Sequence, residues 1–523
     1  MAYLDELIKL GKEKEKKKTE EKKTEEEKKP SKIDEWVEGS LPPGSELIDA
    51  YGICKIYKVK GEKQLIYAVP VPKPAGPDRV IIDTIKEAAT KLITVSPEQI
   101  KDPDERREFY KKRVMEIIKS TPELGVPPNW QPFYAETVVR EMIGYGALDL
   151  LLEDDALEEI MVIGPGKPVY VFHRKYEMCK TNVIFGTDDD IRAIIDRIAR
   201  DVGRRIDIQV PLLDARLPDG SRVNATIPPI SLNGSTITIR KFREDPYTIV
   251  DLIKNGTVSS ELAAFMWIAG EGLSAKPANV IISGGTSSGK TTTLNVMSMF
   301  IPPTERVITI EDTAELKLPI EHWIRFETRP PGLEGTGEID MNALVKNSLR
   351  MRPDRVIVGE VRGEEAFTLF TAMNTGHDGC MGTVHANDSR ETIVRLTNPP
   401  MNVPSVMLSA LDIIITQKKI HDRRKGTIRR VTEVAEVTGV LEGKPQLIYL
   451  YEWDPVTDQI KPTGVPSKYL RTLERYTGLS HAEVMEELER RKEFLEGLVS
   501  KGIRDIKSVS KEITAYIAGG HNG

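Results

Sequence analysis

The stretch SGGTSSGKTTT, residues 283–293, decides how the rest of the chain is interpreted. Residues 280–282 before it are apolar and β-branched and predict a short buried strand. Residues 294–300 after it predict a helix, which must end before the two prolines that follow. Between these elements lies the pattern G-x-x-x-x-G-K-[S/T], whose defining residues are Gly284, Gly289, Lys290 and Thr291.

A strand, a glycine loop and a helix in this order are the context that a phosphate-binding loop requires. Glycines allow successive backbone N–H groups to face a polyphosphate, and the N-terminus of the helix adds a favourable dipole. Lys290 can then reach the β- and γ-phosphates, and the hydroxyl of Thr291 can bind Mg²⁺. The alternative is a glycine turn that binds no ligand, and the flanking strand and helix argue against it.

Composition limits the class of protein. A length of 523 residues predicts two to four domains, and 39% hydrophobic with 29% charged residues is typical of a globular protein. The formal charge of -6 disfavours nucleic acid as the main partner. We find no run of roughly eighteen apolar residues and no signal peptide, so we expect no membrane-spanning helix and no export by that route. Cys54, Cys179 and Cys380 are too widely spaced for a four-cysteine module, and no zinc is expected.

Changes in pattern along the chain predict five segments. Residues 1–32 are mostly Lys, Glu and Thr, which favours a disordered or helical lead without chemistry. Mixed signals over 33–132 indicate a small N-terminal α+β docking domain, and 133–245 reads as a second α/β domain. Residues 246–260 are expected to be a linker, because residues 245–255 contain a proline and few core positions. Residues 261–523 form the predicted nucleotide-binding domain with C-terminal helices.

After the glycine loop, buried β-branched runs alternate with helical stretches. The runs are residues 307–310, 356–358, 381–384 and 412–416. This alternation predicts a mainly parallel sheet with helices on both faces and active residues at the C-terminal ends of its strands. Glu311 follows the first run and Glu360 closes the second. Carboxylates at these ends can complete an Mg²⁺ shell or orient an attacking water.

Two further groups of residues allow more than one interpretation. His377 and His385 flank a glycine-rich stretch, and they are structural hydrogen-bonding residues, an acid or base, or a pair that senses the γ-phosphate. Basic residues at strand ends in the second domain are either simply solvated or supply charge that a nucleotide needs in its transition state. The arginines of this group are Arg216, Arg222, Arg240 and Arg243.

Four motifs, in this order, resemble those of a known family: GGTSSGKTT, ITIEDTAEL, RVIVGEVRGEEA and TGHDGCMGTVHAND. They are similar to the Walker A, Asp box, Walker B and His box of the secretion superfamily ATPases. That family drives type II secretion, type IV pilus and archaellum assembly, and type IV secretion. The resemblance covers residues 136–416, and the missing tetracysteine zinc module makes the chain more similar to archaeal members.

The resemblance implies a RecA-like domain, a PAS-like α/β domain before it, and a ring hexamer with ATP and Mg²⁺ between the two domains. It implies catalytic roles for Lys290, Glu311, Glu360, His377 and His385. Thr291 and Glu360 are expected to hold the metal, partly through water. Phosphate contacts are expected from Gly284, Gly285, Thr286, Ser287, Ser288, Gly289, Lys290, Thr291 and Thr292, and from Arg216, Arg222, Arg240 and Arg243.

We therefore expect an Mg²⁺-dependent ATP hydrolase that works as a hexameric motor for protein secretion or for pilus or archaellum assembly. Its expected partners are further copies of itself, a polytopic membrane platform protein and, indirectly, pilin-like or secreted subunits. The expected location is cytoplasmic, on the inner face of the cytoplasmic membrane. A nucleic-acid translocating ATPase is one alternative, which the lack of a basic stripe disfavours. A non-hydrolysing ATP-binding regulatory module is another, and the two carboxylates argue against it.

Overall fold

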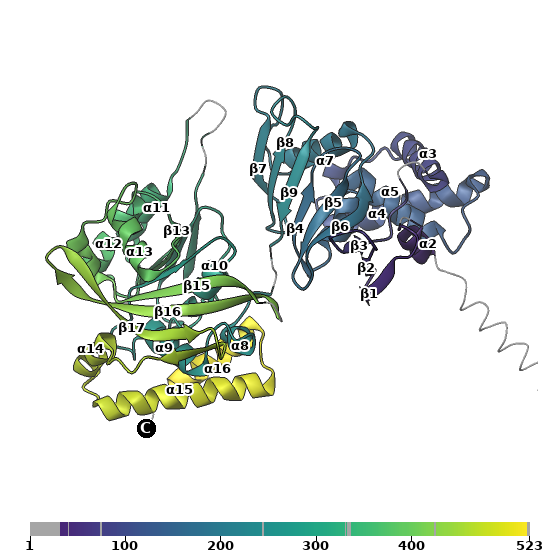
Figure 1. Ribbon diagram of the computed structural model, residues 1–523. Coiled ribbons are helices and arrows are strands. Elements are labelled where there is room, and N and C mark those ends of the chain that lie inside the picture. Colours follow the sequence, from purple (N-terminus) through teal and green to yellow (C-terminus); the bar gives the residue numbers. More distant parts are fainter. Residues whose placement is uncertain are drawn as a thin grey trace, which may run out of the picture. The chain divides into compact units, whose positions relative to one another are not determined.

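The computed structural model describes residues 32–39, 41–73, 76–242, 245–329, 331, 336–422 and 425–519. Almost all of the predicted charged lead lies outside these residues. The chain forms two compact units, Met1–Arg243 and Glu244–Gly523, which we call unit 1 and unit 2 (Figure 1).

Four helices of unit 1 pack around one hydrophobic cluster. They are α2 (Lys32–Glu38), α3 (Pro77–Leu92), α4 (Pro103–Ser120) and α5 (Gln131–Ile143). Trp36 of α2 is buried against the rings of Phe133 and Tyr134 of α5, and its indole N–H donates to Asp78 of α3 at 2.8 Å. This bond satisfies the polar end of a buried aromatic residue, so α2 is held in the bundle by both packing and hydrogen bonding.

Unit 1 also contains a nine-stranded sheet in the order β1-β2-β3-β6-β5-β4-β9-β8-β7. Only β3 and β6 pair in parallel, and every other pair is antiparallel. Helices α6 (Ala147–Leu152) and α7 (Asp188–Asp201) accompany it. The strands are β1 (Glu46–Tyr51), β2 (Cys54–Lys58), β3 (Ile66–Ala68), β4 (Leu157–Val162), β5 (Pro168–His173), β6 (Glu177–Ile184), β7 (Leu212–Arg216), β8 (Arg222–Thr226) and β9 (Thr236–Arg240).

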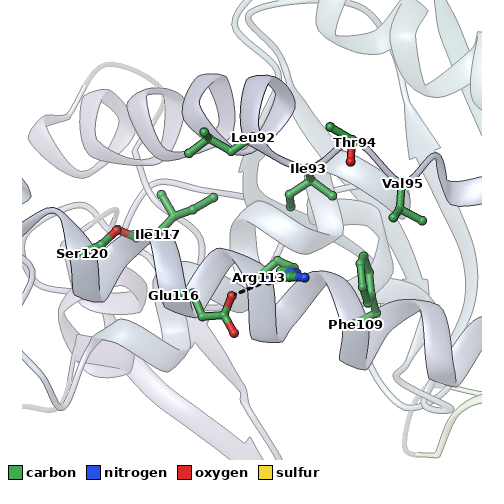
Figure 2. Close-up of a pocket in the computed structure, with 9 residues that line it drawn as sticks. All are labelled: Leu92, Ile93, Thr94, Val95, Phe109, Arg113, Glu116, Ile117 and Ser120. Carbon is green, nitrogen blue, oxygen red and sulfur yellow. Dashed lines mark hydrogen bonds and ion pairs between the residues drawn. The ribbon is translucent and has the colours of Figure 1, made fainter.

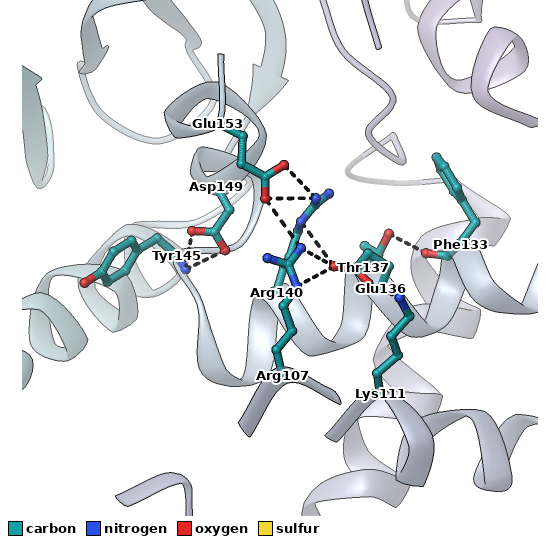
Figure 3. A network of polar contacts seen from close by, with 9 residues as sticks. All are labelled: Arg107, Lys111, Phe133, Glu136, Thr137, Arg140, Tyr145, Asp149 and Glu153. Carbon is teal, nitrogen blue, oxygen red and sulfur yellow. Dashed lines mark hydrogen bonds and ion pairs between the residues drawn. The ribbon is translucent and has the colours of Figure 1, made fainter. Parts of the chain in front are cut away.

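This sheet crosses residue 132, where the sequence predicts a domain boundary, because β1 to β3 come from the earlier segment. A polar network joins the two segments as well (Figure 3). Arg107 and Lys111 of α4 and Arg140 of α5 surround two carboxylates, Glu136 and Glu153. Lys111 lies 3.2 Å from Glu136, and Arg140 lies 3.0 Å from Glu153. The division of unit 1 into two domains stays a prediction.

The sheet of unit 2 has the strand order β12-β11-β13-β14-β10-β15-β16-β17-β18. The strands from β12 to β15 run parallel and the remaining ones antiparallel, so the prediction of a mainly parallel sheet is confirmed. Their bounds are β10 (Val280–Gly284), β11 (Val307–Glu311), β12 (Trp323–Glu327), β13 (Arg355–Val361), β14 (Met381–Val384), β15 (Ile413–Asp422), β16 (Gly426–Leu441), β17 (Lys444–Asp454) and β18 (Gln459–Pro462).

Helices cover both faces of this sheet. Val280 and Ile282 of β10 join one hydrophobic cluster, and Ile281 between them joins another, as the alternation of a strand requires. The first cluster includes residues of α8 (Ile249–Lys254), α9 (Ser260–Glu271), α10 (Lys290–Ser298), α14 (Lys468–Thr477), α15 (His481–Lys501) and α16 (Ile506–Gly519). The second includes residues of α11 (Met341–Ser348), α12 (Glu365–Asn374) and α13 (Ser389–Thr397).

The segment 246–260, which we expected to be a linker, contains helix α8. Thr248 and Asp251 form a capping box at its start, and Ile249, Val250 and Leu252 are buried. These side chains belong to the core of unit 2, so the expectation of few core positions there was wrong. None of the helices within the described ranges is long and apolar enough to cross a membrane.

Candidate nucleotide-binding site

The loop between β10 and α10 has the geometry of an anion-binding loop. Gly289 precedes the first turn of α10 with φ of +99°, which an L side chain rarely adopts. Lys290 is largely buried, and its Nζ donates to the carbonyl oxygen of Gly285 at 2.9 Å. Its ammonium group therefore folds back over the loop, in the place where it can meet a polyphosphate.

Two glycines of the loop leave no room for a side chain. A Cβ at Gly284 would lie 2.3 Å from the carbonyl oxygen of Gln417 and 2.4 Å from Oγ of Ser288. A Cβ at Gly289 would lie 2.7 Å from Nε2 of Gln417. No such restriction is seen at Gly285, where a Cβ would meet no atom of the described residues within 4 Å. The glycine pattern is therefore explained at two positions by contact with β15.

Glu311 is the last residue of β11, and because Ile310 pairs with Val358, it lies level with Gly359 of β13. It is only 2% exposed. Its Oε1 accepts hydrogen bonds from the backbone N–H groups of Glu315, at 2.8 Å, and Leu316, at 3.0 Å, while Oε2 is buried without a hydrogen-bonding partner among the described residues. Burial raises the pKa of Glu311 to about 7.

Glu360 lies in an irregular part of β13. Against β14, Val358 pairs with Gly382 and Val361 with Val384, so β13 holds one residue more than its neighbour between these pairs. Such a bulge changes the direction of a side chain. Glu360 accepts a hydrogen bond of 2.6 Å from Arg362, which also lies 3.5 Å from Asp312. The side chain of Glu360 remains 27% exposed, unlike that of Glu311.

Gly359 leaves room for the side chain of Glu311 on the neighbouring strand. A Cβ at this position would lie 2.9 Å from Cγ of Glu311. The hydroxyl of Thr383 on β14 donates to the carbonyl oxygen of Gly359 at 2.7 Å and fixes the backbone. The glycine that precedes Glu360 in β13 therefore has a steric reason. Many Walker B motifs have an Asp where this chain has Glu360.

The two predicted histidines lie at opposite ends of β14. His385 directly follows Val384, which pairs with Ser283, so it lies at the edge of the sheet where the phosphate loop begins. His377 precedes β14, near the start of β10, where Val280 donates to Cys380. A strand of this length spans about 13 Å. Within a single chain the structure does not bring His377 to the phosphate loop, and the hypothesis that both histidines sense the γ-phosphate stays a prediction.

Three of the four predicted arginines form a row across the sheet of unit 1. Arg216 of β7 pairs with Arg222 of β8, and Arg222 pairs with Arg240 of β9. Residues directly opposite each other in antiparallel strands project from the same face, and like charges placed this way repel. The row concentrates positive charge on one face, and Arg243 lies outside the described residues.

The loop also contains serine and threonine hydroxyl groups, which can contact phosphate oxygens or Mg²⁺. Thr286 and Ser287 are exposed, and Thr291 and Thr292 are half-buried at the start of α10. Oγ of Ser288 is buried, and no described residue forms a hydrogen bond with it. A threonine hydroxyl at the helix start, a nearby lysine and carboxylates at the strand ends are the donor chemistry that Mg²⁺ and a polyphosphate require. The residues present therefore fit both groups.

Sequence reasoning missed three residues around the loop. Arg362 bridges Glu360 and Asp312, and its place directly after β13, two residues beyond Glu360, could have indicated an ion pair between them. Gln417 accepts a hydrogen bond from Thr293, and it directly follows a predicted strand. Arg429 donates to the carbonyl oxygen of Ser287 at 3.0 Å, and nothing in the sequence links it to the loop.

A pocket of about 370 Å³ in unit 1 has different chemistry (Figure 2). It lies between the end of α3 and α4, and its lining mixes apolar side chains, such as Ile93, Phe109 and Ile117, with polar ones. Its one ion pair joins Arg113 and Glu116 at 2.9 Å. Neither a glycine loop nor a helix start faces it, so it is no candidate for the phosphates.

The parallel sheet, the glycine loop at its C-terminal edge and the nearby carboxylates define a P-loop protein of the RecA-like type. The family described as Type II/IV secretion system protein matches residues 144–442. An uncharacterized protein of Methanocaldococcus jannaschii is 34% identical over 71% of this chain and 75% of its own length. The type IV secretion system protein PtlH of Bordetella pertussis is 29% identical over 55% of this chain and 92% of its own length.

Among solved structures, the VirB11 ATPase of the Brucella suis type IV secretion system has 25% sequence identity and a TM-score of 0.28. That match covers 55% of this chain and 91% of the other. Because the family match extends over more than half of the sequence, the chain belongs to the type II/IV secretion system protein family, within the superfamily of secretion traffic ATPases.

Proposed function

We propose that this chain is an Mg²⁺-dependent ATP hydrolase that acts as a hexameric motor. The observation that carries the proposal is the juxtaposition of Glu311 and Gly359-Glu360, at the end of the sheet where the phosphate loop also begins. Phosphoryl transfer depends mainly on positioning and on charge compensation. This edge offers an ammonium group and a helix start for the phosphates, together with acidic groups for a water.

In this proposal the backbone N–H groups from Gly284 to Thr292 and the ammonium group of Lys290 bind the phosphates. The hydroxyl of Thr291 would hold Mg²⁺ directly, and Glu360 would do so partly through water. The metal supplies charge compensation for the phosphate oxygens when it is bound. Glu360 is the more exposed of the two carboxylates and would orient the attacking water.

Glu311 is suited to accept a proton in the same proposal. Its pKa of about 7 lies near the pH at which a general base works best. One of its oxygens is already fixed by two N–H donors, so the other is held in a defined direction. His385, at the same edge, would contact the terminal phosphate, and within a single chain we assign no such role to His377.

The arginine row of unit 1 would bring positive charge to the nucleotide, either in the same chain or from a neighbouring copy. Arginine suits this role because its planar fork matches phosphate oxygens and its charge is permanent. Approach and withdrawal of unit 1 with each cycle would convert hydrolysis into movement. The family supports secretion as the purpose of that movement, and the relative in Bordetella pertussis carries the name of a type IV secretion system protein.

The proposed partners are five further copies of the chain and a polytopic membrane platform protein, with the motor on the cytoplasmic face of the membrane. Co-purification of such a platform protein with the tagged chain from native membranes would support this part. Strong stimulation of hydrolysis by DNA or RNA would instead favour a nucleic-acid translocating ATPase.

The decisive measurement is phosphate release by the wild-type protein and by Lys290→Ala. Removal of the ammonium group deletes the main side-chain charge of the loop, so we expect a loss of about 100-fold or more with a retained fold. Circular dichroism and thermal unfolding control for folding. Substantial residual hydrolysis by Lys290→Ala would contradict the assignment, and steady absence of release from the wild type would favour a regulatory module.

A further inference from the structure

The phosphate loop is held from outside by the hairpin of β15 and β16. Gly284 of β10 pairs with Gln417 of β15, and beyond that pair the hairpin continues past the end of β10. Gln417 accepts a hydrogen bond from Thr293 of α10 through its Oε1. Arg429 of β16 donates from Nε to the carbonyl oxygen of Ser287 at 3.0 Å. A Cβ at Gly289 would lie 3.5 Å from Cδ of Arg429, so the stem of this side chain also lies along the loop.

Arg429 extends from a fixed part of β16. Its neighbour Arg430 is only 5% exposed and pairs with Asp458 through two hydrogen bonds, of 2.7 and 2.8 Å. Arg430 also donates to the carbonyl oxygen of Asn255 at 3.0 Å. Successive residues of a strand point to opposite faces. The buried arginine therefore anchors the strand, and the next residue is presented to the phosphate loop.

The loop needs such an anchor because its backbone is strained at one residue. Ser287 has φ of +58°, in the left-handed region that non-glycine residues seldom occupy. Relaxation of Ser287 towards negative φ would rotate the peptide unit that follows it. The hydrogen bond from Arg429 restrains the carbonyl oxygen of that same peptide unit.

The direction of this peptide decides whether the loop can bind an anion. In a trans peptide the C=O of one residue and the N–H of the next point in opposite directions. With the Ser287 carbonyl held by Arg429, the N–H of Ser288 points towards the carbonyl oxygen of Gly285, at 3.4 Å. Nζ of Lys290 donates to this same oxygen. The Ser288 N–H and the ammonium group therefore converge inside the loop.

We infer that Arg429 is a positioning residue for nucleotide binding: it holds the Ser287–Ser288 peptide so that the Ser288 N–H, which meets the carbonyl oxygen of Gly285 in this structure, is directed into the loop where a phosphate oxygen would replace that carbonyl. This inference rests on the proposed nucleotide-binding function. The residue acts through the loop backbone and not through contact with the phosphates. Its loss is expected to weaken the binding of ADP and ATP alike, and thus to raise KM with little change in kcat.

A glutamine at position 429 distinguishes the effect of the hydrogen bond to the Ser287 carbonyl from the effect of the positive charge. The amide nitrogen Nε2 of glutamine is the same number of bonds from Cα as Nε of arginine. Arg429→Gln therefore keeps a donor for the Ser287 carbonyl and removes the positive charge, whereas Arg429→Ala removes both. Lys418 is the matched control, because it is an exposed basic residue of the same hairpin that pairs with Arg430 across the strands and points away from the loop.

The experiment measures the affinity of the full-length protein for ADP, together with KM and kcat for ATP. We expect Arg429→Ala to weaken ADP binding about tenfold or more, as for loss of a hydrogen bond from a charged donor. Arg429→Gln and Lys418→Ala should stay within about threefold of wild type. Unchanged affinity in Arg429→Ala would overturn the inference, and so would equal losses in the Ala and Gln variants. Failure of the wild-type chain to bind ADP would instead count against the proposed function.

Discussion

At the scale of single residues, the two carboxylates of the site differ in environment although both follow strands of the same sheet. Glu311 is buried and is hydrogen-bonded to two backbone N–H groups, whereas Glu360 is partly exposed and paired with Arg362. Different environments separate the proton affinities of paired acids and thereby assign them different roles. We therefore expect Glu311 to be the pH-sensitive member of the pair.

The raised pKa of Glu311 makes a prediction about stability. Below pH 4.5, the ordinary value, the carboxyl group is protonated in the folded and the unfolded chain alike. Between pH 4.5 and about 7 the unfolded chain releases the proton while the folded chain retains it, so stability falls as pH rises. Above that range, ionisation of the buried Glu311 lowers the free energy of unfolding by its full amount, on the order of 3 kcal/mol.

Glu311→Gln should remove this cost, because a neutral amide oxygen can still accept the two N–H bonds. The difference in free energy of unfolding between the variant and the wild type should increase from about pH 5 to about pH 8. Urea unfolding at several pH values measures it. Glu321→Gln, at an exposed position between β11 and β12, is the control. A difference that does not change with pH would show that Glu311 ionises as an ordinary glutamate.

At the scale of helices and strands, the C-terminal helices belong to the core of unit 2. Arg491 of α15 is 4% exposed and donates to Glu271 of α9 at 2.8 Å. Its guanidinium group also lies 4.7 Å from the centre of the Trp267 ring. Figure 1 shows α15 along the side of unit 2 where α8 and α9 lie. Since α9 precedes β10, this pair connects the C-terminal helices to the element that leads into the phosphate loop.

Breaking this buried pair should be costly. Arg491→Ala leaves the carboxylate of Glu271 buried without its cation, and we expect a loss of about 3–5 kcal/mol in the free energy of unfolding. The adjacent Arg490 is the control, since its side chain is 58% exposed and its ion pairs with described residues are to Glu486 and Glu487 of its own helix. Arg490→Ala should cost less than about 1 kcal/mol. Equal effects of the two variants in urea unfolding would contradict the buried-pair argument.

Elements with strong local signals could be predicted from the sequence, and weaker ones could not. β10, β11 and β13 are continuous apolar runs, and their burial on both faces of a parallel sheet follows from that pattern. β12 reads WIRFE, with charged residues inside a short edge strand, and it was not predicted. α8 was missed because six residues carry too little helical periodicity, so its capping box was the only usable signal.

The same contrast holds for the candidate site. The glycine loop and the two carboxylates were found because each is adjacent in sequence to a recognisable strand. Arg429 lies 142 residues from Ser287 in the chain, and only the pairing of β15 with β16 brings them together. The separation of His377 from His385 by a strand likewise depends on topology, which a motif read along the sequence does not contain.

At the scale of the whole molecule, function in this proposal depends on two units with complementary charge. Unit 2 carries the loop and the carboxylates, and unit 1 carries the row Arg216, Arg222 and Arg240. Ground-state phosphates are already bound by the loop, whereas charge in the transition state spreads over the oxygens of the transferred group. Guanidinium groups supplied by unit 1 are therefore expected to contribute more to kcat than to the binding of ADP.

Arg222 is the middle member of the row, so Arg222→Ala tests whether unit 1 contributes more to kcat than to the binding of ADP. We expect kcat for ATP hydrolysis to fall by about 10- to 100-fold, because one preorganised cation is lost from the transition state. The affinity for ADP should change by less than about threefold, since the product lacks the transferred group. Arg200→Ala, at an exposed position of α7, controls for the removal of a positive charge from unit 1. If Arg222→Ala weakened ADP binding as strongly as it lowered kcat, the row would serve to hold the nucleotide, and unit 1 would have no specific part in the chemical step.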